Sequence, residues 1–532
     1  MGYLPEATAS VEPVRRQVIE FRGYSNAPMI EDGEMREMRN LSSDLYPVLS
    51  QRKPRGLYSD KITKPHNILA WKEKLAYVDG KTFYYGEERK GSLETEGEKI
   101  LAPINNKICI WPDKICYNLI TDKMEPLGAS FETGTLDTGA YISVTHNTLT
   151  IPGADFSSFA TEDTVILSGF TTCEDNNTSA AIVKIEANVI TFPDNSFIMP
   201  EADKETGTYK EYGNVKIDRP VPDMEFVVES NNRLWGCKGN SIYSCKLGDP
   251  KNWNDYSMIS HAAYAVDVGT DGDFTGVTAY PTHIAFFKED YIHRLYGSNK
   301  PSTYQIDTIR GLGLQKGCHK SIQAVDGVIY YKSREGIVAY DGTYPVLITQ
   351  NFKYKYTEAV AGTDLMKYYV SMKREDGIWD FFAYDLNRQL WHQEDNTHAG
   401  MFTFLAGKLI YIDAGVNKVY VINADKDIIP EDEQLEWSAT FGDYDEYLEN
   451  NKIYSRIQMR FEMEDQAELT VLISVDHGPW ERICYLYTDK QRTMYLPIVP
   501  RRCDKFRLRL EGKGRTKIES IVRLCRQGSG IK

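Results

Sequence analysis

The sequence predicts an all-β protein built from several modules. Three observations support this class: a hairpin pattern that recurs along most of the chain, a composition rich in strand and turn residues, and a C-terminal region with strict period-two alternation. The 532 residues include 35 Tyr, 39 Gly and 22 Pro, which suit half-exposed strands joined by tight turns better than helix bundles. The length exceeds one ordinary domain, so about two to four domains are expected.

One hairpin form occurs seven times. It consists of an alternating apolar run, a short turn containing Gly, Asp, Asn or Lys, and a second alternating run. Where nothing intervenes, successive hairpins begin roughly 40 residues apart, which is the period of a β-propeller blade. Both faces of the alternation are apolar, as expected where each blade is covered by its neighbours. The hairpins are Ile68–Gly86, Lys107–Leu119, Arg233–Cys245, His283–Gly297, Gly327–Gly342, Lys367–Asp385 and Gly407–Ala424.

These repeats divide the chain into four parts. Residues 1–60 are expected to form an N-terminal arm that enters the propeller, and residues 61–135 and 220–425 to form the propeller itself. Between them, residues 136–219 contain short alternating runs such as AYISVTHNTLTI, which predict an inserted small β-barrel. After an acidic linker, residues 426–532 hold five or six runs of period two, which predict a C-terminal β-sandwich.

Cys237 and Cys245 flank the turn of one hairpin, where a disulfide or a metal site would be conceivable. The other repeats place Phe, Tyr, Val or Ile at such positions, and no His lies within 15 residues on either side. The chain has nine cysteines, an odd number, and no Cys-x-x-Cys motif. Core packing is therefore favoured over a disulfide, and a disulfide over a metal site.

Three short motifs invite a chemical interpretation that their spacing does not support. Ser474–Trp480 resembles the Asp-box of sialidase-type propellers but is one residue short and lies in the predicted sandwich. Asp267–Gly276 lacks the ligand positions of an EF-hand loop. Gly311–Gly317 is not a dinucleotide fingerprint and precedes no helical pattern. A turn or surface loop is favoured for each, and the sequence predicts no enzyme, no cofactor and no metal.

The charge balance limits the partners. Lys and Arg number 62 against 76 Asp and Glu, a net charge of −14, which argues against wrapping a nucleic-acid backbone. No run approaches the roughly 18–20 apolar residues of a membrane span, and no secretory signal is visible at the N-terminus. The chain is expected to be made in the cytoplasm, or to belong to something assembled there.

Positive charge gathers near the C-terminus of this acidic chain. The solvated face of a sandwich is the plainer interpretation, and a docking surface for an acidic partner, including another copy of this chain, is the sharper one. The candidate docking residues are Arg492, Arg501, Arg502, Lys505, Arg507, Arg509, Lys513 and Arg515.

The N-terminal stretch Tyr24–Gly56 resembles the start of phage tail hub or nozzle proteins, the family called tail tubular protein B or head-completion stabilisation protein in short-tailed phages. The residues that fill its pattern are Glu37–Ser43 and Pro47–Arg55. Further stretches that look like this family are Asn231–Tyr256, Val268–Gly297 and Val499–Gly514.

The resemblance implies a structural virion protein rather than an enzyme. Such proteins form a ring, usually of six copies, at the distal end of the portal and adaptor complex. The ring extends and closes the channel through which DNA leaves, and it can hold tail fibres or spikes. The implied partners are other copies of this chain, the portal and adaptor proteins, fibres or spikes, and genomic DNA that passes without sequence-specific binding. The implied location is the tail of a virion assembled in the host cytoplasm.

Two alternatives belong to other classes. A propeller lectin or receptor-binding protein would use Tyr and Trp on its loops to stack on sugars. A cluster of carboxylates about 5–10 Å apart at one propeller face would favour the other alternative, a propeller glycosidase.

Overall fold

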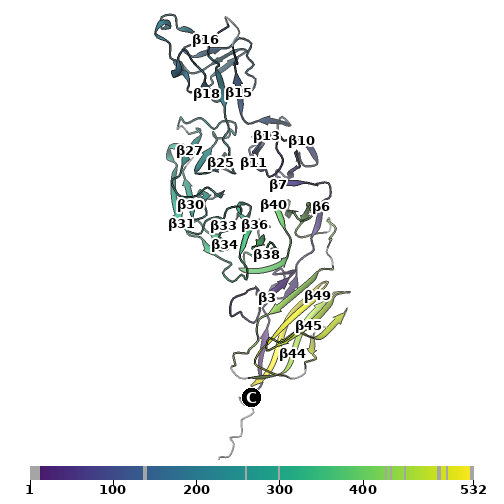
Figure 1. Cartoon of the computed structure of the whole chain (residues 1–532). Helices are drawn as coiled ribbons and strands as arrows, with labels where there is room; N and C mark the ends of the chain where they lie inside the picture. Colours follow the sequence, from purple (N-terminus) through teal and green to yellow (C-terminus); the bar gives the residue numbers. More distant parts are fainter. Residues whose placement is uncertain are drawn as a thin grey trace, which may run out of the picture. The chain divides into compact units, whose positions relative to one another are not determined.

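The structure is a computed structural model, which describes residues 12–527 except for 136–139, 258–259, 298–299, 426–427, 432–433, 449–450, 488–492 and 499–500. The described residues form strands joined by turns and a few 3-10 turns, without an α-helix, and the all-β prediction is confirmed (Figure 1). Within that range no helix is long and apolar enough to cross a membrane. The chain forms two compact units. Unit 1 comprises Met1–Thr63, Lys320–Ala339 and Val346–Lys532; unit 2 comprises Lys64–His319 and Tyr340–Pro345.

Unit 2 holds four antiparallel sheets, each made of four strands that follow one another along the chain. The first strands of these sheets lie side by side, in the order β7, β11, β24, β28. The sheets are β7 (Pro65–Trp71), β8 (Lys74–Asp79), β9 (Thr82–Tyr85) and β10 (Glu88–Ser92); β11 (Ile100–Ile104), β12 (Lys107–Trp111), β13 (Ile115–Asn118) and β14 (Lys123–Pro126); β24 (Phe226–Ser230), β25 (Arg233–Lys238), β26 (Ser241–Ser244) and β27 (Tyr264–Asp267); β28 (Gly276–Tyr280), β29 (His283–Phe287), β30 (Tyr291–Tyr296) and β31 (Gln305–Arg310).

Three further four-stranded sheets lie mainly in unit 1, where the first strand of the middle sheet, β36, packs beside β32 and β40. The last of the three is completed by β6, which comes from the N-terminal region and pairs with β42. The sheets are β32 (Gln323–Val325), β33 (Val328–Lys332), β34 (Ile337–Tyr340) and β35 (Val346–Leu347); β36 (Tyr356–Thr363), β37 (Lys367–Arg374), β38 (Trp379–Asp385) and β39 (Leu390–Asp395); β40 (Ala399–Leu405), β41 (Lys408–Asp413), β42 (Lys418–Val421) and β6 (Gly56–Ser59).

The predicted hairpins correspond to these sheets one by one. Each hairpin supplies the second and third strands of a four-stranded sheet, and Ile68–Gly86 also includes most of the first strand, β7. The apolar residues on both strand faces are buried: β29 is buried along its whole length, and β37 along its first six residues. Four-stranded antiparallel sheets of this kind are the units from which propellers are built.

The segment predicted to be a small barrel forms two separate sheets instead. The first consists of β15 (Ala129–Glu132), β23 (Lys216–Arg219), β18 (Thr164–Ser168) and β19 (Ser179–Ala181). The second consists of β20 (Lys184–Glu186), β21 (Val189–Thr191), β17 (Thr148–Thr150), β16 (Ile142–Thr145) and β22 (Thr208–Glu211). Buried residues of both sheets share one hydrophobic core. No strand bridges the two sheets within the described residues, so the sheets face each other without closing into a barrel.

Two large sheets form the remainder of unit 1. The A sheet has the order β4 (Leu41–Ser42), β5 (Leu49–Gln51), β50 (Thr516–Gln527), β44 (Lys452–Met463) and β47 (Thr493–Leu496), with β1 (Val14–Val18) also on β50 and β48 (Arg501–Cys503) also on β44. The B sheet has the order β2 (Gly23–Tyr24), β3 (Glu34–Arg39), β43 (Glu436–Phe441), β49 (Phe506–Lys513), β45 (Glu468–Val475) and β46 (Glu481–Tyr487). The inner faces of the two sheets meet at Tyr454 of the A sheet and Phe506 of the B sheet. The centroids of these two rings lie 4.5 Å apart, in an edge-to-face arrangement.

The N-terminal region differs from the arm expected over residues 1–60. Strands β1 to β5 belong to the A and B sheets, and only β6 joins a four-stranded sheet. The pairings that hold them are remote in sequence: β1 lies on β50, and β3 lies on β43. Local alternation carries no information on such pairings, especially for β2 and β4, which have two residues each.

A buried ionic cluster holds this N-terminal region in place. Nη2 of Arg55 lies 2.7 Å from Oε2 of Glu394, and its Nη1 lies 3.0 Å from Oδ2 of Asp395. Arg52 lies 3.6 Å from Glu394 and donates to Oδ1 of Asn40 at 2.9 Å. Two cations face two carboxylates, and their pairing offsets the cost of removing from water Arg52, Arg55 and Glu394, which are buried, and Asp395, which is 16 % exposed.

Replacement of Arg55 by Ala should destabilise unit 1 by about 3–5 kcal/mol, because Glu394 and Asp395 would keep buried charge without their main counterion. Urea denaturation measures the change. Arg460→Ala is the control, since Arg460 is 59 % exposed and 3.9 Å from Glu519; it should cost less than about 0.5 kcal/mol. Equal losses for the two variants would contradict a structural role for the cluster.

The stability of unit 1 should also depend on pH through the carboxylate of Asp395. Burial acts to raise the pKa of Asp395, but Arg55 and Arg52 outweigh it and hold that pKa below its usual range. The stability that Asp395 contributes is therefore present above its unfolded pKa of about 3.9 and is lost as pH falls through the folded pKa. We expect Asp395→Asn to be less stable than the wild type at neutral pH, with a difference that shrinks below about pH 4. A difference independent of pH would contradict this assignment.

Candidate functional site

The predicted docking residues do not form one surface. Lys505, Arg507, Arg509 and Lys513 follow one another on the outer side of the B sheet, along and just before β49. Arg515 lies beyond the end of β49, beside Glu464. Arg502 belongs to β48 of the A sheet. Arg501 also lies in β48, with only its backbone described, and Arg492 lies outside the described residues.

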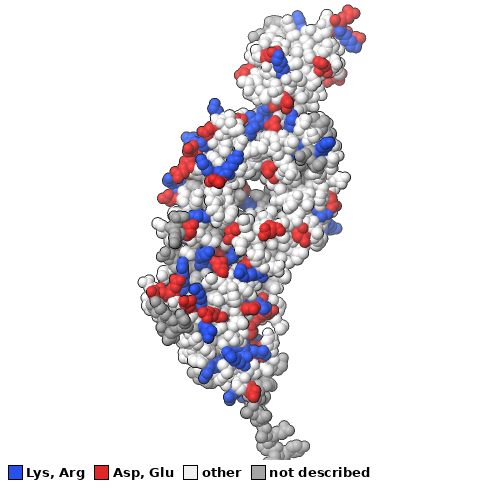
Figure 2. Space-filling model, turned by 180° about the vertical axis from the view of Figure 1, so that it is seen from behind, with Lys and Arg blue, Asp and Glu red and all other residues white. Residues whose placement is uncertain are grey.

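At one end of this row the positive charge is neutralised. Asp443 lies 3.4 Å from Lys505 and 3.7 Å from Arg507. Glu37 forms a 2.8 Å ion pair with Arg509, whose guanidinium also lies 4.5 Å from the ring centre of Trp480. Mixed charge is also visible in Figure 2, where Lys and Arg are interspersed with Asp and Glu over the face shown. The role of the basic residues in docking stays a prediction.

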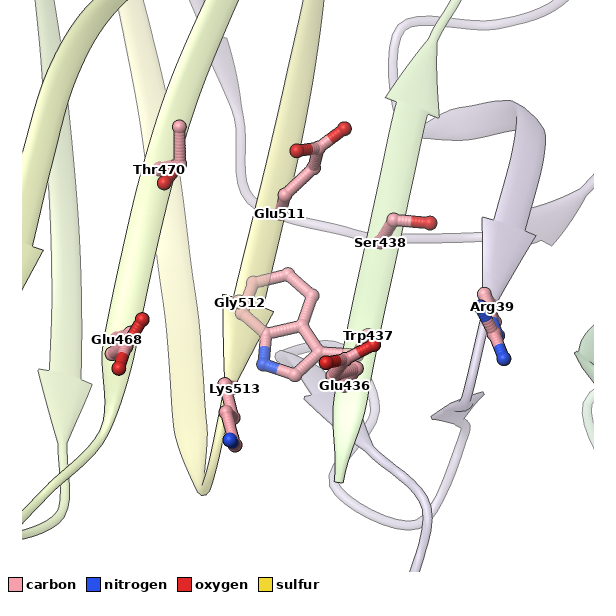
Figure 3. A pocket seen from close by; sticks show the side chains of 9 residues that line it. All are labelled: Arg39, Glu436, Trp437, Ser438, Glu468, Thr470, Glu511, Gly512 and Lys513. Atoms are coloured by element: carbon pink, nitrogen blue, oxygen red, sulfur yellow. The ribbon is translucent and has the colours of Figure 1, made fainter. Parts of the chain in front are cut away.

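At the other end of the row, the outer face of the B sheet carries a polar groove of about 330 Å³ (Figure 3). We call it the B-sheet groove. It crosses four strands, β3, β43, β49 and β45. The lining residues are Arg39, Glu436, Trp437, Ser438, Glu468, Thr470, Glu511, Gly512 and Lys513.

The strand register sets the groove side chains in two rows. Arg39 pairs with Ser438, Ser438 with Glu511, and Glu511 with Thr470. In the second row, two residues further along the same strands, Glu436 pairs with Lys513, and Lys513 with Glu468. Directly opposed residues of neighbouring strands have Cβ atoms about 4.5–5.5 Å apart. Hydroxyls, carboxylates and cations therefore alternate across the face at regular intervals.

Five of these side chains have no polar partner. Arg39, Glu436, Ser438, Thr470 and Lys513 form no side-chain hydrogen bond or ion pair with any residue that the structure describes. Lys513 is flanked in register by two glutamates, yet neither lies within 4.0 Å of its ammonium group. Elsewhere in the same unit, charged side chains at comparable positions are paired, as Arg509 is with Glu37. The groove therefore has hydrogen-bonding capacity to spare.

Two tyrosines lie beside the groove, on the strand next to β45. Tyr487 lies opposite Glu468, and Tyr485 lies opposite Thr470. Both belong to β46, the edge strand of the B sheet, and both point outward, with 50 % of Tyr485 and 57 % of Tyr487 exposed. Two half-exposed aromatic rings on one strand face are thus the register neighbours of two lining residues, Thr470 and Glu468.

Trp437 and Gly512 belong to the opposite, inward-facing positions of the same strands. They are register partners, and Trp437 is 97 % buried with its indole N–H donating to the carbonyl of Gly514. A Cβ atom at Gly512 would lie 2.3 Å from the indole ring. Only glycine leaves the space that this ring occupies, so the floor of the groove depends on the pair.

The structure also places the motifs that the sequence singled out. Cys237 and Cys245 are fully buried and free, in agreement with core packing. Asp476 lies in the turn between β45 and β46 and accepts hydrogen bonds from the backbone N–H groups of Asp504 and Lys505, both at 3.0 Å. Ser474 donates to the carbonyl of Gly478 in the same turn. This is the strand-turn-strand that the sequence favoured over an Asp-box site.

The Asp/Gly loop at Asp267–Gly276 is occupied by a cation of the chain itself. Nζ of Lys288 donates to the carbonyl oxygen of Thr270 at 2.7 Å and to Oδ1 of Asn240 at 2.5 Å. In the glycine motif after β31, a Cβ at Gly313 would lie 1.9 Å from the carbonyl oxygen of Lys288, so close backbone packing explains that glycine. Among the described residues no group of three or more His, Cys, Asp or Glu side chains could hold a metal ion.

Comparisons with known proteins do not assign a family. No model of a known protein family matches the chain, and no curated protein matches it. Solved structures that the chain matches include Hsv2 from Kluyvelomyces marxianus, with 13 % identity over 42 % of this chain and 67 % of that one, at a TM-score of 0.28. An exo-beta-1,3-galactanase from Phanerochaete chrysosporium has 10 % identity over 56 % of this chain and 94 % of that one, at 0.20. A putative 6-phosphogluconolactonase from Bacteroides fragilis has 10 % identity over 86 % and 99 %, at 0.32. Likenesses of this size carry no argument about activity.

Replacement of Gly512 by Ala should disturb the floor of the groove. The new methyl group would overlap the Trp437 ring, and overpacking of this kind costs about 1–3 kcal/mol. Urea denaturation measures the loss, and a red shift of tryptophan emission would report displacement of the ring. Gly269→Ala is the control, because nothing lies within 4 Å of its Cβ position. A neutral Gly512→Ala variant would contradict the packing described here.

Proposed function

We propose that this protein is a structural subunit of a virion tail, which forms a ring with other copies of itself at the distal end of the portal and adaptor complex. In this proposal the seven four-stranded sheets are the blades of one β-propeller. Strand β6 supports it: a strand from before the first blade completes the last sheet beside β42, as expected where a propeller joins its two ends. The proposal involves no catalysis.

The observation that carries the proposal is the structural role of the stretch that resembles tail hub and nozzle proteins. Leu41, Ser42 and Ser43 are buried, and the two serines contact the four-stranded sheets: Ser42 accepts from Nζ of Lys367 at 2.8 Å, and Ser43 donates to Asp385 at 2.6 Å. Arg52 and Arg55 form the buried ionic cluster. The residues of this motif are buried and engaged in contacts within the fold. A resemblance that rests on such residues concerns the architecture of the protein and its assembly, and not an active site.

The charge of the chain is compatible with DNA passing through such a ring. A protein with net charge −14 repels phosphate, whereas a basic lumen would hold the backbone by counterion release. The portal and adaptor proteins, and fibres or spikes, are the partners that the proposal includes. The basic residues of β49 and its flanks stay candidates for one of these contacts.

A second candidate function is glycan or receptor binding by a propeller-type protein. The B-sheet groove favours it, because unpartnered polar side chains lie beside the half-exposed Tyr485 and Tyr487. The propeller-like solved structures are compatible with this candidate, although none of them argues for it at these TM-scores. A glycosidase is the weaker alternative.

The copy number in purified particles tests the main proposal. Quantitative mass spectrometry of virions should find this chain at about six copies per about twelve portal subunits, as expected for a closed cyclic ring. The portal protein of the same particles is the internal standard. Absence of the chain from the particles would overturn the virion assignment and leave the binding function as the remaining candidate.

A further inference from the structure

We propose that the B-sheet groove binds an uncharged saccharide, which stacks on Tyr485 and Tyr487 and is hydrogen-bonded by Glu468, Thr470 and Glu511. The inference rests on the second candidate function and specifies its class of ligand and its binding site. It is independent of the ring assembly.

The aromatic part of the argument concerns β46. Tyr485 and Tyr487 are two residues apart, so their rings rise from one face of the strand about 7 Å from each other. Each ring is at least half exposed, and β46 is the edge strand of the B sheet as far as the described residues show. Aromatic faces accept the C–H faces of sugar rings. The phenol group of Tyr485 interacts with the carboxylate of Glu468, which holds that ring beside the groove. The pair offers a platform that continues the line of the groove.

The polar part concerns the groups next to that platform. Thr470 is opposite Tyr485 and Glu468 is opposite Tyr487, and Glu511 and Lys513 follow on the next strand. A carboxylate accepts from two neighbouring hydroxyl groups, a threonine hydroxyl both donates and accepts, and an ammonium group donates. A saccharide presents donors and acceptors on successive carbons, which matches this mixture.

The charges select against other ligands. Glu436, Glu468 and Glu511 face Arg39 and Lys513 in the groove, and Arg509 lies 3.9 Å from Glu511. The groove therefore has no excess of positive charge that would attract an anion such as a phosphate or a uronic acid. A stable protein partner would require about 800 Å² of contact with an apolar centre. It would also bury unpaired charges, which is costly unless each finds a partner.

The size of the groove agrees with a small ligand. Its volume of about 330 Å³ lies at the lower end of the roughly 300–1,000 Å³ that ligand sites occupy. A mono- or disaccharide is therefore the unit expected to be bound, as a free sugar or as the exposed end of a longer glycan.

Titration calorimetry of the full-length chain tests the proposal. The probes are glucose, galactose, N-acetylglucosamine, maltose, lactose and cellobiose, with glucuronate and N-acetylneuraminate as charged counterparts. We expect at least one uncharged probe to bind with a dissociation constant of about 1 mM or below. Tyr487→Ala and Thr470→Val should each weaken that binding about tenfold, and the charged probes should not bind.

Tyr495→Ala is the matched control. Tyr495 is 56 % exposed on β47, an edge strand of the A sheet, outside the groove. Its removal should leave binding unchanged, and the thermal midpoints of all three variants should stay at the wild-type value because the replaced side chains lie on the surface.

Each other outcome contradicts the proposal in a distinct way. If uncharged probes bind equally to all variants, the protein binds glycans, but at a site other than this groove. Binding of charged probes alone would overturn the ligand class. Absence of binding would overturn both this inference and the second candidate function, without bearing on the copy number in virions. A wild-type dimer that Tyr487→Ala dissociates would assign the groove to contact with another copy.

Discussion

The buried pairing of Arg52 and Arg55 with Glu394 and Asp395 is the interaction on which the organisation of unit 1 depends. These two arginines lie between β5, which belongs to the A sheet, and β6, which completes the last four-stranded sheet. The carboxylates stand at the end of β39, in the middle four-stranded sheet of the unit. Because neither side can be buried without the other, the cluster fixes the N-terminal strands and the four-stranded sheets in one arrangement.

Strands from the two ends of the described chain pair with each other in unit 1. Strand β1 pairs with β50, and β3 pairs with β43. The A and B sheets therefore require the N-terminal region to be complete, and the sandwich predicted over residues 426–532 is only part of the structure that forms.

The sequence predicts local structure well and remote pairing poorly. The seven hairpins follow from alternation and turn chemistry, which short-range sterics determine, and each corresponds to a four-stranded sheet. The N-terminal strands do not follow from the sequence, because β2, β4 and β5 have only two or three residues, and β1 and β3 pair with strands remote along the chain. The inserted module was expected to close into a barrel, and alternation cannot distinguish two facing sheets from a closed one. The basic residues of β49 were identified from charge alone, whereas Glu436, Glu468 and Tyr487 join them only through the register. Period two in the C-terminal region places these residues on outward faces, but it does not say which strands are neighbours.

Amide hydrogen exchange tests most directly whether the stretch that carries the family resemblance is a structural clamp. The comparison is between the full-length chain and its Arg52→Ala/Arg55→Ala variant. Local opening raises exchange where tertiary support is lost. We expect faster exchange in β4, β5, β6 and β39 of the variant, with β12 and β29 of unit 2 unchanged. Equal protection of β4, β5, β6 and β39 in both proteins would contradict the claim.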